Sequence, residues 1–238
     1  MNRKGMTLLE CLISLGLISF VVVAAFQFFV LAGGIFSKLR EIQNNSQAML
    51  ASLDKIKADV RRAGLGLAEL ITTHIEPDFL SASGTFLEIH LIDRTFRVAE
   101  DAPVGAERLK LDKPTSGIRP GREIMLGNGS TSEILTVSSA DTELINLAQP
   151  LNFSYKAAST SALLLEKITY FLDIPGNTLR REVNDGSAQP LLENVRTAEF
   201  DYDPGENKFT VRLVTGSKGE LSDGFSLFPK NMALASPK

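Results

Sequence analysis

The chain has 238 residues, a formal net charge of −3 at pH 7, one cysteine, two histidines and no tryptophan. This slightly acidic balance gives no reason to expect a nucleic-acid partner, because such binding relies on clustered Lys and Arg side chains. One cysteine excludes an intrachain disulfide, and two histidines are too few for a typical metal site.

The N-terminal segment combines a short basic leader with a long apolar run. Arg3, Lys4 and Gly5 come first, and no charged side chain occurs from Cys11 to Ser37. A helix of this length, at about 1.5 Å per residue, can cross a bilayer, and the basic leader places its N-terminus in the cytoplasm. Glu10 opens the run. An ionised carboxylate at membrane depth costs about 2.5–3.5 kcal/mol, so we expect Glu10 to have a partner.

This start resembles the type IV prepilin superfamily, on the residues Lys4-Gly5-Met6-Thr7-Leu8-Leu9-Glu10. In that family a prepilin peptidase cuts after the glycine, the new N-terminal residue is methylated, and a Glu four residues further on makes an assembly contact. The resemblance therefore implies removal of residues 1–5 by cleavage between Gly5 and Met6, N-methylation of Met6 and an assembly contact at Glu10. The family usually has Phe at the position of Met6, which is a mild departure.

Two other interpretations of the same segment remain open. An ordinary secretory signal has an apolar core of about 7–15 residues, which is shorter than this run, and Ala24-Ala25 offers only a poor cleavage site. A plain signal anchor accounts for the topology equally well, but it leaves Glu10 without a role.

After Gly33-Gly34 the pattern changes from apolar to amphipathic, with near-helical spacing. The apolar positions are Ile35, Leu39, Ile42, Met49, Leu53, Ile56, Val60 and Ala63. The charged residues expected off this stripe are Lys38, Arg40, Glu41, Asp54, Lys57, Asp59, Arg61 and Arg62. We predict one helix from Met6 to Ala63, with a transmembrane half over 6–36, an amphipathic half over 37–64 and a stop at Gly64. Gly33-Gly34 and Asn44-Asn45 are the expected places for a bend or local melting.

Residues 65–238 are predicted to form a β-rich domain punctuated by Gly and Pro. The predicted strands are Thr85–Ile92, Thr95–Ala99, Arg108–Leu111, Glu123–Leu126, Glu133–Val137, Glu143–Leu147, Leu163–Leu172, Thr178–Val183, Pro190–Leu192, Ala198–Tyr202 and Phe209–Val214. Two hairpins are expected, one turning at Asn184-Asp185-Gly186 and one at residues 203–207. The expected fold class is α+β and pilin-like, with a long N-terminal helix packed on an antiparallel β-rich domain.

A narrower resemblance comes from two further segments. Residues 58–66, Ala-Asp-Val-Arg-Arg-Ala-Gly-Leu-Gly, look like the helix end of PilW-type minor pilins. The cadence from Ile168-Thr-Tyr170 through Leu179-Arg-Arg181 to Val195 is similar both to PilW-type pilins and to GspJ-type pseudopilins of type II secretion. Residues 69–163 resemble neither family.

Few residues form a pattern that suggests a catalytic or metal-binding site. His90 alternates with Glu88 and is expected to be a half-exposed strand residue. Asp201, Asp203 and Glu206, with Asn207, are weak candidates for a Ca²⁺ site, but Pro204-Gly205 explain the same segment as a hairpin turn. No nucleophile motif occurs, so we expect neither an enzyme nor a cofactor.

The sequence is interpreted as a minor pilin of a type IV pilus that assembles, primes or lies near the tip of the filament. The alternative is a GspJ-like pseudopilin, and the rival from a different class is a signal-anchored envelope enzyme. The resemblance implies three kinds of partner: the prepilin peptidase, other minor and major pilins, and an inner-membrane assembly platform. The expected location is the bacterial inner membrane, crossed once, with the C-terminal domain in the periplasm, followed by incorporation into a pilus or pseudopilus.

Overall fold

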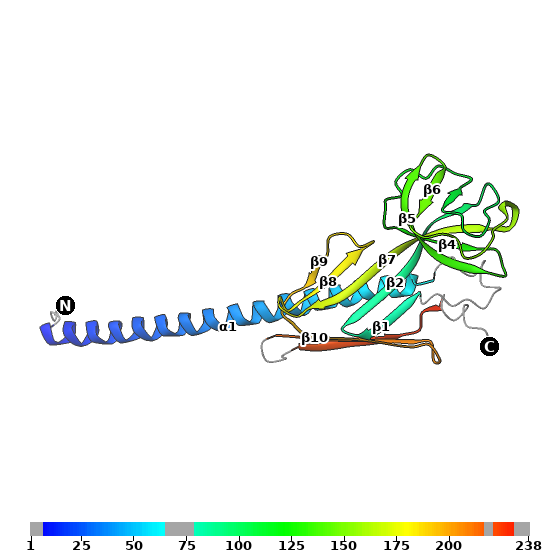
Figure 1. Cartoon of the computed structure of the whole chain (residues 1–238). Helices are drawn as coiled ribbons and strands as arrows, with labels where there is room; N and C mark the ends of the chain where they lie inside the picture. The colour runs from blue at the N-terminus through cyan, green and yellow to red at the C-terminus, as the bar shows by residue number, and fades with distance from the viewer. Residues whose placement is uncertain (1–6, 65–78, 217–220, 231–238) are drawn as a thin grey trace. The chain divides into compact units, whose positions relative to one another are not determined.

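A computed structural model describes residues 7–64, 79–216 and 221–230 of the chain. The chain divides into two compact units, Met1–Ala48 and Met49–Lys238. The α-helix α1 (Leu8–Arg62) contributes its first part to unit 1 and its last part to unit 2 (Figure 1).

In unit 1, every residue described from Leu8 to Ala48 belongs to α1. Long apolar side chains without proline favour an uninterrupted helix. The helix continues through Gly33-Gly34 and Asn44-Asn45, so the local melting considered for these pairs is not seen. The apolar side chains of this segment are exposed within the chain, with Phe20 and Phe29 each 73% exposed. Lipid or other protein chains must therefore cover them.

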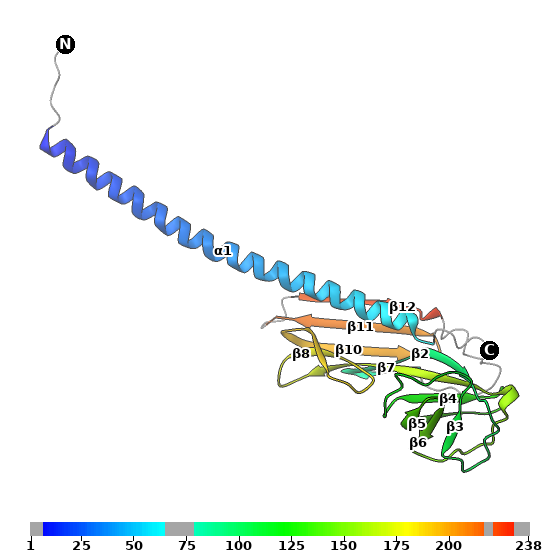
Figure 2. The same cartoon turned by 90° about the horizontal axis from the view of Figure 1, so that it is seen from above.

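Unit 2 contains the end of α1 and a large antiparallel sheet (Figure 2). The strands are β1 (Leu80–Gly84), β2 (Phe86–Arg97), β3 (Arg108–Lys110), β4 (Glu123–Gly127), β5 (Ser132–Asp141), β6 (Leu144–Leu147), β7 (Ser161–Asp173), β8 (Thr178–Val183), β9 (Gln189–Leu192), β10 (Val195–Asp203), β11 (Lys208–Thr215) and β12 (Leu221–Leu227). A short 3₁₀ turn, η2 (Ala157–Ser159), precedes β7. The strand order is β12-β11-β10-β1-β2-β7-β4-β5-β6-β3, and β8 pairs with both β7 and β9. A long helix packed on this sheet confirms the predicted α+β, pilin-like fold class.

The end of α1 packs on one face of this sheet. Met49, Leu53, Ile56, Val60 and Ala63 are all at most 5% exposed. Their partners in this first core come from β1, β2 and β7–β12. The predicted stripe is thus confirmed from Met49 onward.

The first three positions of the stripe do not follow this pattern. Ile35, Leu39 and Ile42 are 62%, 56% and 36% exposed. They lie in unit 1, where the described part of the chain supplies no core for them to enter.

The helix ends where the sequence predicted. Arg62 is its last residue, and Gly64 adopts a φ of 66°, the left-handed conformation that glycine tolerates at helix ends. The Gly64 amide donates to the carbonyl oxygen of His90 on β2 at 3.4 Å. This bond ties the end of α1 to the sheet.

Strands β2 and β7 are long because they serve two cores. Before a β-bulge between Ile92 and Arg94, odd-numbered residues such as Leu87 and Ile89 face the first core. After it, Phe96 faces a second core. A bulge adds one residue and so shifts the alternation by one. This shift explains why the sequence predicted two strands, Thr85–Ile92 and Thr95–Ala99, where the structure has one.

The second core belongs to a small lobe, defined here as β3–β6 with the second half of β2 and the first half of β7. Its buried side chains include Leu109, Ile124, Leu135 and Ile145. The small lobe lies at the end of unit 2 near the C-terminal end of α1, since β2 carries both His90 and the bulge.

Both predicted hairpins are confirmed. Asn184 and Asp185 both have a φ of 53° between β8 and β9, and residues 203–207 connect β10 to β11. Two strands were not predicted, β1 and β12. Their sequences, Leu-Ser-Ala-Ser-Gly and Leu-Ser-Asp-Gly-Phe-Ser-Leu, are rich in Ser and Gly, which are typical of turns rather than strands.

Candidate functional site

The start of α1 is closed by a reciprocal pair of side chains, Thr7 and Glu10. The Thr7 amide and hydroxyl donate to Glu10 Oε2 at 2.9 and 3.1 Å, and the Glu10 amide donates to Thr7 Oγ1 at 3.3 Å. This is a capping box, in which a Thr at the N-cap and a Glu three residues later satisfy free amides at the helix start. Glu10 therefore has a partner within its own chain.

The predicted cleavage and methylation residues, Gly5 and Met6, lie outside the described residues. Immediately after the capping box comes Cys11, which is exposed and unpaired as a thiol. By length and composition, α1 qualifies as a helix that can cross a membrane, and its most apolar stretch is wholly unburied within the chain. The arrangement is a capped helix start followed by a helix whose apolar side chains are exposed within the chain.

A second polar site lies where α1 crosses the sheet. The Asp59 carboxylate accepts hydrogen bonds from the Tyr170 hydroxyl at 2.7 Å and from Arg181 Nε at 3.0 Å. Lys55, one turn earlier, lies 3.3 Å from the other carboxylate oxygen. Asp59 is 1% exposed, so the prediction that it lies off the buried stripe is wrong.

The electrostatics of this site follow from its burial. Burial, followed by the Asp59 carboxylate, raises the pKa of Tyr170 far above its usual range. For Arg181, burial acts to lower the pKa, but the charge of Asp59 and the hydrogen bond with Tyr170 give a net rise. The phenol stays protonated and the guanidinium stays charged, so both donate to Asp59.

Ser52 and Asp59 share the buried face of α1 with the apolar residues. Asp59 lies three residues after Ile56 and four before Ala63, which is helical spacing. Asp59 has the spacing of the stripe, but it was predicted to lie off the stripe together with the other charged residues. The Ser52 hydroxyl donates to the carbonyl oxygen of Leu191 on β9 at 3.1 Å.

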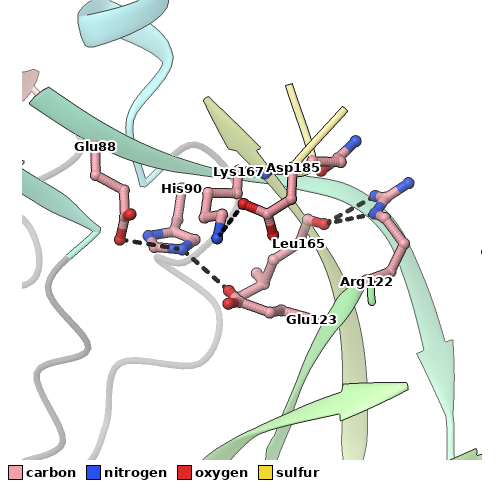
Figure 3. Close-up of polar contacts among 8 residues, drawn as sticks. Glu88, His90, Arg122, Glu123, Leu165, Lys167 and Asp185 are labelled. Atoms are coloured by element: carbon pink, nitrogen blue, oxygen red, sulfur yellow. Dashed lines mark hydrogen bonds and ion pairs between the residues drawn. The ribbon is translucent and has the colours of Figure 1, made fainter. Parts of the chain in front are cut away.

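A third polar cluster occupies the opposite face of β2 and β7 (Figure 3). His90 Nε2 lies 3.0 Å from Glu123 Oε2 on β4 and 3.9 Å from Glu88 Oε1. The alternation of Glu88 and His90 is confirmed, but His90 is only 7% exposed rather than half-exposed. The ring of Phe79 packs edge-on against it, with ring centroids 6.5 Å apart.

The neighbours of His90 extend this cluster. Lys167 pairs with Asp185 at 2.8 Å. Burial acts to lower the pKa of Lys167, but the hydrogen bond and charge of Asp185, with the charges of Glu123 and Glu88, raise it. For Glu123, the hydrogen bond with His90 lowers the pKa, outweighing burial. The cluster joins β2, β4, β7 and the β8–β9 turn by charge.

The weak calcium candidates lie at the β10–β11 turn. Asp203 Oδ1 accepts hydrogen bonds from the amides of Gly205 at 2.8 Å and Glu206 at 3.2 Å, as a turn residue does. Asn207 bonds the Tyr202 hydroxyl and the carbonyl oxygen of Pro229. Asp201 is exposed on β10. Within the described residues, His, Cys, Asp and Glu side chains form no group of three that is arranged to hold a metal ion.

Comparison with known proteins adds one informative match. Residues 1–26 match the family described as the prokaryotic N-terminal methylation motif. These residues include Gly5, Met6, Thr7 and Glu10. Together with the long apolar α1, the motif supports a type IV pilin-like or pseudopilin protein, anchored by a single membrane helix. Such a motif implies processing by a prepilin peptidase and assembly with other pilins.

The other comparisons are uninformative. No curated protein matches the chain. The tailspike gp61 of Pseudomonas phage phi297 is 10% identical over 32% of this chain and 14% of its own, with a TM-score of 0.28. The Gp54 tailspike of Acinetobacter baumannii bacteriophage AP22, in complex with capsular saccharide, is 12% identical over 33% and 15%, also with a TM-score of 0.28. The chain spans a small part of either tailspike, and neither likeness carries an argument.

Proposed function

We propose that the chain is a minor pilin of a type IV pilus, acting in filament assembly rather than as an enzyme. It is made as an inner-membrane protein with a cytoplasmic N-terminus and a periplasmic β-rich domain. A prepilin peptidase removes residues 1–5, Met6 is methylated, and the helix then passes from the bilayer into a filament. Its partners are other pilins and the inner-membrane assembly platform.

One observation carries this proposal. The methylation motif, residues 1–26, covers the start of a helix that begins with the Thr7–Glu10 capping box and continues as an exposed apolar surface. A plain anchor also has an apolar helix, but it needs neither the Lys4-Gly5-Met6 junction nor an acidic residue at membrane depth.

The role of Glu10 now has two competing explanations. It is either a capping residue alone, or a capping residue that also binds the N-terminal amine of a neighbouring subunit during assembly. Truncating one member of a buried ion pair costs about 3–5 kcal/mol, whereas losing a helix cap costs about 0.5–2 kcal/mol. The charge of Glu10 separates the two explanations, because Gln also serves as the third residue of a capping box.

The test compares three variants of the whole chain. Glu10→Gln keeps the cap and removes the charge, Thr7→Ala removes the capping hydroxyl and keeps the charge, and Glu10→Ala removes both. We expect both Glu10 variants to reach the membrane at wild-type level and to be depleted from sheared filaments by at least about tenfold, since 1.4 kcal/mol already corresponds to that factor. Thr7→Ala is expected to be recovered nearly as well as the wild type.

The opposite ranking would contradict the proposed role. If Glu10→Gln enters filaments like the wild type while Thr7→Ala and Glu10→Ala fail, then Glu10 acts only through the helix cap. Recovery of all three variants at wild-type level would remove Glu10 from the assembly mechanism.

A further inference from the structure

A hollow of about 400 Å³ lies where three connections of unit 2 meet. It is lined by Asn177, Asn194, Val195, Arg196 and Gly216. Backbone hydrogen bonds join the three segments. The Val195 amide donates to the Asn177 carbonyl at 2.8 Å, and the Gly216 amide donates to the Asn194 carbonyl at 3.0 Å. The volume lies in the range of pockets that hold small ligands, about 300–1,000 Å³.

Arg196 is placed at this hollow by an irregularity in β10. The register between β10 and β11 shifts between Val195 and Thr197, so Arg196 is the extra residue of a β-bulge. A bulge redirects a side chain away from the regular alternation of a strand. Arg196 is exposed, and among the described residues no acidic side chain pairs with it. The hollow therefore has an unneutralised cation in its wall.

Asn177 and Asn194 add neutral donors beside this cation. Both have a left-handed backbone, with φ of 46° and 57°, which Asn tolerates better than most residues. Neither side-chain amide has a hydrogen-bond partner in the part of the chain that the structure describes. A guanidinium beside two amides suits a phosphate, because each N–H can donate to an anionic oxygen. The acids nearby do not oppose this, since Asp173 pairs with Arg180 at 2.8 Å and Glu193 lies outside the lining.

The turn between β7 and β8 adds an exposed apolar side chain next to the hollow. Ile174 is 70% exposed, and its carbonyl oxygen accepts from the Asn177 amide at 3.2 Å. Apolar side chains beside basic ones characterise protein surfaces that lie in the interface of a bilayer. The combination of Ile174 with a cationic hollow therefore favours a lipid as the ligand.

The hollow lies at the end of unit 2 where α1 enters. Met49 is the first residue of this unit, and its Sδ lies 3.8 Å from Oγ1 of Thr215, the residue before Gly216. About 18 Å of α1 separates Met49 from Ser37, the last residue of the charge-free run, at about 1.5 Å per residue. The bilayer that holds this run is therefore within reach of the hollow.

We propose that this hollow binds the phosphate group of an anionic phospholipid while Ile174 contacts the acyl boundary, so that unit 2 docks on the bilayer that holds α1. The phosphate accepts hydrogen bonds from Arg196 and from the amides of Asn177 and Asn194. A free phosphate could use the same donors, but it would leave Ile174 without a contact. The docking rests on the anchoring of the chain by α1 and does not depend on the minor-pilin function proposed above.

The chain has no tryptophan, so one substitution supplies a single fluorescent reporter. The full chain with Ile174→Trp would be reconstituted in phosphatidylcholine vesicles with or without phosphatidylglycerol, using brominated acyl chains that quench tryptophan only at short range. We expect strong quenching with phosphatidylglycerol and weak quenching without it. Val104→Trp, at a position before β3 that is 63% exposed, is the matched control and should stay unquenched.

A third reporter separates docking from anchoring. Phe20→Trp lies in the apolar run of α1 and should be quenched in both kinds of vesicle. Quenching of Phe20→Trp without quenching of Ile174→Trp would overturn the docking alone. An unquenched Phe20→Trp would overturn the anchoring and the docking with it.

The contribution of the hollow is tested in the Ile174→Trp chain. Arg196→Gln should lower the ratio of docked to undocked chain about fivefold in the phosphatidylglycerol vesicles, the factor typical of one basic side chain near an anionic surface. Arg119→Gln removes the same charge at another exposed position and should leave the quenching unchanged. Equal quenching in the two variants would contradict a role of the hollow.

Inorganic phosphate, added at constant ionic strength, distinguishes a lipid headgroup from a free anion. The quenching of Ile174→Trp should persist, because the membrane anchor keeps the lipid headgroups at a high effective concentration beside the hollow. Loss of this quenching would show that the hollow takes free phosphate, and it would overturn the assignment to a phospholipid.

Discussion

Asp59 of α1 and Tyr170 of β7 are joined by a 2.7 Å hydrogen bond in which the phenol donates to a carboxylate that is only 1% exposed. Arg181 of β8 completes the site at 3.0 Å from the same oxygen. A buried carboxylate is tolerated only when it is paired and hydrogen-bonded, so this contact makes the docking of α1 depend on two strands of the sheet.

The first prediction concerns the charge of Asp59. Asp59→Asn leaves the Arg181 guanidinium without its anion, which typically costs about 3–5 kcal/mol. In the full chain in detergent, this loss should lower the melting temperature of the β-sheet signal by on the order of 10 °C. The control is Asp54→Asn, the same change at an exposed position of α1, and it should shift the melting temperature little.

Removing both charges separates the ion pair from a packing effect. Asp59→Asn combined with Arg181→Met should recover part of the lost stability, because the charge that remains, on Lys55, belongs to a side chain that is 45% exposed to solvent. Equal melting temperatures for Asp59→Asn and Asp54→Asn would show that the buried pair does not hold α1 to the sheet.

The second prediction compares two leucines of α1. Leu53 is 5% exposed in the first core, and Leu50 is 51% exposed. Leu53→Ala opens a cavity and should cost about 2–5 kcal/mol, whereas Leu50→Ala should change stability by less than about 0.5 kcal/mol. Thermal melts of the two full-length variants measure the difference. A similar loss for both would mean that α1 presents a different face to the sheet.

The third prediction concerns Arg122, which directly precedes β4 and contacts Asp93 at the bulge of β2. Its guanidinium donates to the Leu165 carbonyl from Nε at 3.2 Å and from Nη2 at 2.8 Å, and it pairs with Asp93 at 2.9 Å (Figure 3 shows the two bonds to Leu165). Arg122→Lys keeps the charge but loses the planar fork, so the unfolding free energy should fall by about 1–3 kcal/mol. Arg119→Lys, at an exposed position nearby, is the control. Identical melts for the two variants would contradict a structural role of the fork.

The fourth prediction is a dependence on acid. The folded-state pKa of Glu123 lies below its ordinary value of 4.5, because the hydrogen bond with His90 outweighs burial. Below pH 4.5 the unfolded state binds more protons, so the stability that Glu123 contributes is complete above pH 4.5 and is lost as pH falls through the lowered pKa. Glu123→Gln should therefore be less stable than the wild type at pH 7 and should lose less on acidification. Glu107→Gln, an exposed control, should retain the wild-type profile.

Several features of the fold were predictable because one local signal dominated. The charge-free run predicted the exposed part of α1, Gly64 predicted its end, and Asn184-Asp185-Gly186 predicted a hairpin. Strand β12 was missed because Asp223-Gly224 is a turn signal, and it is paired with β11 only through tertiary structure. The β2 bulge was missed because a shift in alternation is indistinguishable in sequence from a break between two strands.

At the candidate site, the sequence pointed to Glu10 but not to its partner in the chain. The signal was present, since Thr7 three residues before Glu10 is the capping-box spacing. Asp59 was predicted to lie off the buried face with the other charged residues. Its spacing from Ile56 and Ala63 is nevertheless that of the buried face, where the structure has it. Its partners Tyr170 and Arg181 are 111 and 122 residues away, a distance that no local pattern bridges.

The most direct test of the central claim is the mass of the N-terminal peptide of the chain isolated from its native membrane. The account predicts a peptide that begins at Met6 and carries one methyl group on its amine. In a Gly5→Val variant, the leader should remain and the chain should be absent from filaments. An intact Met1 on the membrane-bound wild type, or a cut near Ala25, would contradict the assignment to the type IV pilin-like class.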